Sequence, residues 1–106
     1  MISVLVVAAP GADPEELAGR HPSVEILAAQ GVEDALEKLA RNRRIDAVLL
    51  LAGQANPAVA GAIREDNPAH PPLFSPAGQP AAEGVRPLPA VRPAELLDLL
   101  LQELDS

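Results

Sequence analysis

The chain has 106 residues, no cysteine, a hydrophobic content of 48% and a net charge of −7. This length and composition indicate one globular domain, and the lack of cysteine excludes disulfides, thiolate metal sites and cysteine nucleophiles. The sole aromatic residue is Phe74, and the one basic cluster is Arg41, Arg43 and Arg44, so the sequence offers neither the stacking platform nor the basic stripe of a nucleic-acid binder.

The sequence shows no sign of a membrane segment or an export signal. It contains no apolar run of the roughly 18 residues that a membrane-spanning helix requires. The apolar stretch at residues 2–9 has no basic flank and is too short for a signal peptide. We therefore expect a cytoplasmic protein whose partners include neither nucleic acid nor membrane.

The first part of the chain predicts a buried strand followed by a short helix. Residues 2–9 (ISVLVVAA) form a continuous apolar run, which is typical of a strand buried on both faces of a parallel sheet. After a proline–glycine pair, Asp13 has the position of a helix N-cap, with Pro14 as the first helical residue and Glu16 completing the capping pattern.

The next part of the chain repeats this alternation. Residues 24–28 and 45–52 are apolar runs that predict two further strands. Gly31 opens the segment between them, which has apolar residues at the spacing of one helix face: Val32, Ala35, Leu36, Leu39 and Ala40. Opposite charges four residues apart favour the same helix: Asp34 with Lys38, and Glu37 with Arg41.

Residues 56–66 predict a weaker helix, with Asn56 as its N-cap and Pro57 as its first residue. The residues expected on its buried face are Val59, Ala62 and Ile63. Eight of the twelve prolines follow between residues 68 and 93. Two short strands are expected there, at 73–75 and 85–88, and Pro87 places the second at a sheet edge because proline cannot donate a ladder hydrogen bond.

The last predicted element is a helix that begins at Pro93. Its leucines form one broad face: Leu96, Leu97, Leu100, Leu101 and Leu104. Leu99 lies off that face, between Glu95 and Glu103 on the helical wheel. These three residues are the candidate interaction surface.

The alternation of strands and helices predicts a parallel sheet built from βαβ units. We expect a single domain over residues 1–106, with a flavodoxin-like (CheY-like) three-layer α/β fold and a five-stranded parallel sheet in the order 2-1-3-4-5. The short connection between the last two strands predicts a reduced fourth helix.

Three segments resemble the receiver domain of bacterial response regulators. GVEDALEKLARNRRIDAVLLL is similar to that family's second helix and third strand, VLVVAA to its first strand, and VRPAELLDLL to the approach to its last helix. The resemblance implies an acidic pair after the first strand that holds Mg²⁺, an aspartate phosphoacceptor ending the third, a hydroxyl residue ending the fourth and a lysine ending the fifth.

This chain departs from that pattern. The acidic pair aligns with Ala8 and Ala9, the phosphoacceptor with Leu51, the hydroxyl residue with Ser75 and the lysine with Pro89. Alanine and leucine can neither coordinate Mg²⁺ nor accept a phosphoryl group. The resemblance therefore implies a pseudo-receiver with no catalytic residue, no metal and no cofactor.

Other polar residues could form a functional site, but each also has a purely structural explanation. Asp13, Glu15 and Glu16 could hold a metal, but they fit a helix cap. His21 and His70 lack a ligand spacing and are expected in surface loops. The basic cluster could bind an acidic partner, or it could simply complement the dipole at the end of a helix.

The main functional hypothesis is a signalling adaptor or regulatory domain that binds a protein partner or itself, alone or as the N-terminal domain of a longer protein. The alternative is a small-ligand sensor that uses the apolar crevice at the carboxyl ends of the strands. An enzyme is disfavoured, because the sequence has no paired nucleophile and base and no cofactor fingerprint.

Overall fold

The computed structural model describes residues 2–8, 24–42, 44–78, 84–89 and 93–105. The helix expected at Asp13 lies outside these ranges. Within them the elements, in chain order, are β1 (Ile2–Ala8), β2 (Val24–Gln30), α1 (Val32–Arg41), β3 (Ala47–Leu51), the 3₁₀ turn η2 (Gly53–Ala55), α2 (Asn56–Asp66), β4 (Leu73–Pro76), β5 (Val85–Leu88) and α3 (Pro93–Asp105).

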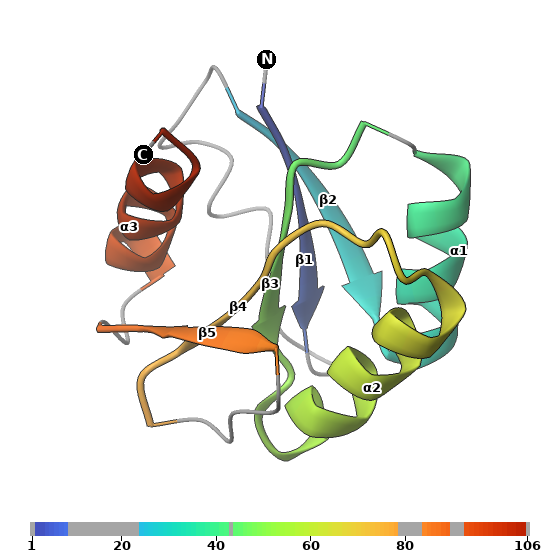
Figure 1. Ribbon diagram of the computed structural model, residues 1–106. Coiled ribbons are helices and arrows are strands. Elements are labelled where there is room, and N and C mark those ends of the chain that lie inside the picture. Colours follow the sequence, from blue (N-terminus) through green and yellow to red (C-terminus); the bar gives the residue numbers. More distant parts are fainter. Residues whose placement is uncertain (1, 9–23, 43, 79–83, 90–92, 106) are drawn as a thin grey trace.

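The five strands form one parallel sheet in the order β2-β1-β3-β4-β5. Helices α1 and α2 cover one face of the sheet, and α3 lies on the other (Figure 1). The predicted flavodoxin-like, three-layer α/β fold is therefore confirmed.

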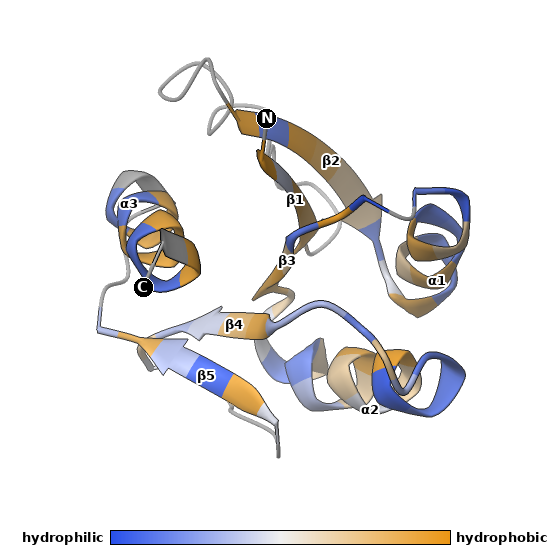
Figure 2. Cartoon of the chain, turned by 45° about the horizontal axis from the view of Figure 1, so that its top comes forward, coloured by the Kyte–Doolittle hydropathy of each residue, from blue (hydrophilic) through white to orange (hydrophobic). Residues whose placement is uncertain are grey.

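The two central strands are apolar because both of their faces are covered. Residues 4–7 of β1 and 47–50 of β3 are fully buried, and both strands are coloured as hydrophobic for most of their length in Figure 2. Because successive side chains of a strand point to opposite faces, each strand contributes alternately to two separate cores.

The α3-side core lies between the sheet and α3, and the α1/α2-side core lies on the opposite face. The first consists of Val4, Val6, Val24, Ala47, Leu49, Phe74, Leu88, Leu96, Leu97 and Leu100. The second consists of Leu5, Val7, Ala29, Ala35, Ile45, Val48, Leu50, Val59, Ala60, Ile63, Leu73 and Val85.

Helix α1 begins after Gly31, whose φ of 90° favours glycine. The predicted ion pair between Glu37 and Arg41 is present at 2.8 Å. The carboxylate of Asp34 was expected to face Lys38, but it accepts a hydrogen bond from the backbone N–H of Gln30 at 3.0 Å. Such a bond back to the residue before the cap ties the helix to the end of β2.

Two alanines that the spacing placed on buried helix faces are not buried in the structure. A helix contacts a sheet over a strip that is narrower than the whole apolar face of the helix. Ala40, at the end of α1, is exposed. In α2 the buried apolar residues are Val59, Ala60 and Ile63, so Ala60 occupies the place that the spacing assigned to Ala62. Helix α2 consists mostly of small side chains, and its spacing therefore gives little information about which side faces the core.

Strand β5 lies at the sheet edge, as Pro87 predicted. Arg86 and Pro87 are exposed, whereas Val85 and Leu88 at the two ends of the strand are buried. The connection from β4 to β5 spans residues 77–84, and its described part, 77–78 and 84, is turn.

Helix α3 begins at Pro93, as predicted, and has 13 residues. Leu96, Leu97 and Leu100 are buried against the sheet, and Leu101 and Leu104 are partly buried beside them. In the part of the chain that the structure describes, no helix combines the length and the apolar character needed to cross a membrane.

The burial of α3 gives a stability prediction. Leu97 is fully buried, so we expect Leu97→Ala to lower the free energy of unfolding by about 2–5 kcal/mol, because the substitution leaves a cavity. Leu101→Ala, on the same helix but only partly buried, should lower it less. Urea denaturation of both variants measures the difference, and equal losses would contradict this assignment of the buried face.

Candidate functional site

The positions that align with the receiver site lie at the carboxyl ends of the central strands, and two of them are neighbours. Ala8 of β1 is paired with Leu51 of β3 in the sheet register. Ala8 is 2% exposed, and Leu51 is partly buried against the α3-side core. Ala9 lies outside the described residues. At this edge the two strand ends therefore present a methyl and an isobutyl group, neither of which is an oxygen ligand.

Ser75 lies in β4 and is fully buried. It is on the face of Leu73, which belongs to the α1/α2-side core, because side chains alternate along a strand. Its hydroxyl oxygen has no hydrogen-bond partner. A buried hydroxyl without a partner is costly, and its burial also keeps it from acting as an accessible group at the strand end.

Pro89 follows β5 directly and is exposed. Its ring has no amine, so it cannot supply the positive charge that the resemblance assigns to this position. The structure therefore brings Ala8 and Leu51 together, buries Ser75 and leaves Pro89 at the surface.

The loop after β3 is braced by a contact that the sequence did not predict. Asn56 was expected as the N-cap of the helix that follows, but it is the first residue of α2 and is 1% exposed. Its Oδ1 accepts a hydrogen bond from the backbone N–H of Ala52 at 2.8 Å. The contact closes the loop at Gly53, whose φ is 60°, and so fixes the start of α2 against the end of β3.

The described histidine and acidic residues give little support for a metal site. No three of them come close enough together to hold a metal ion in the described ranges. His70 is partly buried, and its Nδ1 lies 2.7 Å from the carbonyl oxygen of Pro71, which accepts a hydrogen bond when Nδ1 is protonated. Asp13, Glu15, Glu16 and His21 lie outside the described residues.

The candidate interaction surface on α3 extends onto β5, and we call it the α3–β5 surface: Arg86, Glu95, Leu99, Glu103 and Leu104. Glu95 is exposed, and Glu103 Oε2 lies 3.4 Å from Arg86 Nη1. Leu99 was expected off the buried face, but it is partly buried against the α3-side core. A hollow of about 270 Å³ lies at the end of this surface, lined by Pro72, Leu73, Phe74, Gly84, Arg86, Glu103 and Leu104.

Two larger hollows lie at the amino ends of the strands, the edge opposite to Ala8 and Leu51. One of about 660 Å³ is lined by Leu39, Ala40, Asn42, Ile45, Asp46, Asp66, Asn67, Ala69, Pro71 and Pro72. Another of about 420 Å³ is lined by Ser3, Glu25, Leu27, Arg41, Asn42, Arg44 and Ile45. Sequence reasoning missed both, because their walls come from segments that are distant in the chain.

No protein-family model matches the sequence, and a search of curated proteins gave no match. Function is therefore inferred from the fold and from the side chains described above.

Asn56 and Ser75, the buried polar residues in the described ranges, give opposite stability predictions. Asn56→Ala should lower the free energy of unfolding by about 1–3 kcal/mol, because it leaves the N–H of Ala52 without a partner. Ser75→Ala removes a hydroxyl that has no partner, so stability should stay equal or rise by up to about 1 kcal/mol. Chemical denaturation measures both. A large loss in Ser75→Ala would show that the hydroxyl is bound in solution.

Proposed function

We propose that this chain is a pseudo-receiver: a regulatory domain or adaptor that is not phosphorylated, catalyses no reaction and acts by binding a partner protein. One observation carries the proposal. Ala8 and Leu51 are paired at the carboxyl edge of a sheet with the receiver strand order, at the positions where a receiver needs an Mg²⁺ ligand and a phosphoacceptor.

The chemistry of those two positions supports this conclusion. Phosphoryl transfer to a receiver requires an aspartate oxygen as the nucleophile and Mg²⁺ held by further oxygens, the ligands that this ion prefers. Hydrocarbon side chains provide neither. The hydroxyl of Ser75 is fully buried and cannot replace the missing nucleophile. The fold is therefore retained without its usual reaction.

The α3–β5 surface is the proposed binding surface. Along α3, Leu99 lies one turn from both Glu95 and Glu103, and all three residues retain some exposure. Leu104 lies beside the hollow that Arg86 and Glu103 also line. The apolar centre is flanked by Glu95 and by the ion pair of Glu103 with Arg86, and it fits a partner that presents an apolar patch with a basic side chain opposite Glu95.

Charge also favours a different protein over a second copy as the partner. The chain carries a net charge of −7, so two copies repel one another. Glu95 adds to that repulsion where it meets an acidic side chain of the second copy. A basic partner removes that penalty and gains attraction at the rim.

One test of the proposed function concerns phosphorylation. We expect beryllofluoride with Mg²⁺, a mimic of the phosphoryl group, to leave the amide resonances of Ala8, Leu51 and Ala52 where Mg²⁺ alone leaves them, because no aspartate oxygen is present to bind it. Heteronuclear NMR measures this, with a phosphorylatable receiver treated in parallel as a control for the reagent. A saturable shift at Leu51 would overturn the pseudo-receiver assignment.

Another test of the proposed function concerns the α3–β5 surface. Affinity capture from the host lysate should retain a basic partner on the wild-type chain, and titration of the purified partner then gives the dissociation constant. We expect Glu95→Lys to weaken binding by about five- to tenfold through the lost charge attraction, and Leu99→Glu to weaken it more by placing a charge in the apolar centre.

The controls separate binding from folding and from net charge. Glu65→Lys makes the same charge change at an exposed position on α2, and it should bind like the wild type. Thermal unfolding of Leu99→Glu shows whether its weaker binding reflects a lost fold, since Leu99 is partly buried. Equal affinity for Glu95→Lys and the wild type would rule out this surface, and dimerisation in sedimentation experiments would instead favour a second copy as the partner.

A further inference from the structure

A second binding site is suggested by the hollow of about 420 Å³ where α1 ends and where β1 and β2 begin. Its volume falls in the range of about 300–1,000 Å³ that is usual for small-molecule sites. We infer that this hollow binds a small organic monoanion: a carboxylate with a short apolar body. The inference goes beyond the proposed function, because the site is at the amino edge of the sheet, away from the α3–β5 surface.

The floor of the hollow is apolar. Ile45 is 7% exposed within the α1/α2-side core, and Leu27 of β2 is partly buried against the same core. A hydrocarbon body placed on these two side chains is removed from water, which favours binding by roughly 25 cal/mol per Å² of buried apolar surface. The floor therefore fits a short aliphatic chain.

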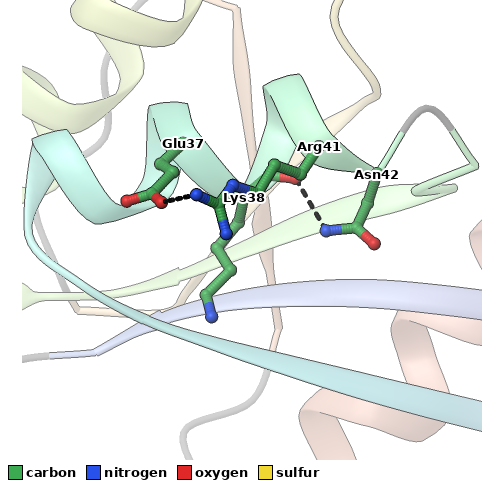
Figure 3. Close-up of polar contacts among 4 residues, drawn as sticks. All are labelled: Glu37, Lys38, Arg41 and Asn42. Carbon is green, nitrogen blue, oxygen red and sulfur yellow. Dashed lines mark hydrogen bonds and ion pairs between the residues drawn. The ribbon is translucent and has the colours of Figure 1, made fainter.

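Two arginines, Arg41 and Arg44, are among the residues that line the hollow. Arg41 is bound to Glu37 at 2.8 Å (Figure 3), with 76% of its side chain exposed. Arg44 is exposed and makes no ion pair with any residue that the structure describes. A guanidinium offers several parallel N–H donors that match the two oxygens of a carboxylate. Arg44 is therefore the main anchor for the ligand, and Arg41 adds positive charge beside it.

Hydrogen bonds fix the backbone at two of the residues that line the hollow, Ser3 and Asn42. The backbone N–H of Ser3 donates to Asp46 Oδ2 at 2.8 Å, and the N–H of Asp46 donates back to the Ser3 carbonyl at 2.8 Å. The side chain of Asn42 donates to the carbonyl of Lys38 at 2.9 Å, which ends α1 beside the site (Figure 3). The backbone beside the hollow is therefore held in place, and the ligand has to order mainly the exposed side chains of Arg41 and Arg44.

Glu25 limits the charge of the ligand. Its side chain is exposed and lines the same hollow. Glu25 repels a phosphate dianion more strongly than a single carboxylate, and a compact phosphate also leaves the apolar floor uncovered. The site therefore favours a monoanion with an apolar body over inorganic phosphate.

The test is an NMR titration of the isotope-labelled chain with sodium hexanoate. We expect saturable shifts at the amides of Ser3, Leu27, Arg44 and Ile45. Arg44→Gln should weaken binding at least about tenfold, because it removes a charge-assisted hydrogen bond. Arg64→Gln makes the same charge change at an exposed position on α2 and should bind like the wild type. Dispersed resonances confirm that each variant is folded.

Two further titrations test separately the charge and the apolar body of the ligand. Hexan-1-ol has the same apolar body without the charge, and inorganic phosphate has charge without the body, so both should bind more weakly than hexanoate. Equal binding of the alcohol overturns the role of the guanidiniums, and equal binding of phosphate overturns the role of the floor. Absence of saturable shifts with hexanoate, or an unchanged affinity in Arg44→Gln, overturns the site itself.

Discussion

The pairing of β1 with β3 is the interaction on which the rest of this structure depends. The central residues of both strands are fully buried, and the two helical layers pack on opposite faces of this pair (Figure 1). A strand covered on both sides has to be apolar along its length. Here the apolar run extends to the paired last residues, Ala8 and Leu51. The proposed loss of phosphoryl chemistry rests on the same two residues.

The carboxyl edge also shows how the chain accommodates its buried polar groups. Asn56 compensates for its burial by accepting the N–H of Ala52, which makes the loop after β3 part of the scaffold. Ser75, on the neighbouring strand, has no such partner. A buried polar group that forms a hydrogen bond stabilises the fold, and one without a partner destabilises it. The two residues therefore have opposite effects on stability, although both are buried.

The charges of the molecule are distributed unevenly. The acidic residues Glu95 and Glu103 flank Leu99 on α3, whereas Arg41 and Arg44 line a hollow near the end of α1, on the other face of the sheet. A chain with a net charge of −7 repels anions at long range. Only a site with local guanidiniums and an apolar floor overcomes that repulsion. The two sites are accordingly proposed for different partners: a basic protein surface on α3–β5, and a small monoanion at the hollow near the end of α1.

Local patterns in the sequence determined the elements and their order. Continuous apolar runs predicted β1, β2 and β3, the 3.6-residue spacing predicted α1 and α3, and Pro87 predicted an edge strand, because each signal depends only on neighbouring residues. Tertiary structure alone decided which side of a helix faces the sheet: Ala60 is buried instead of Ala62, Ala40 is exposed and Leu99 is partly buried. It also brought Ser3, Glu25 and Arg44 around one hollow. The physical reason is that helix rotation and pocket walls depend on contacts between distant segments, which spacing along one segment does not encode.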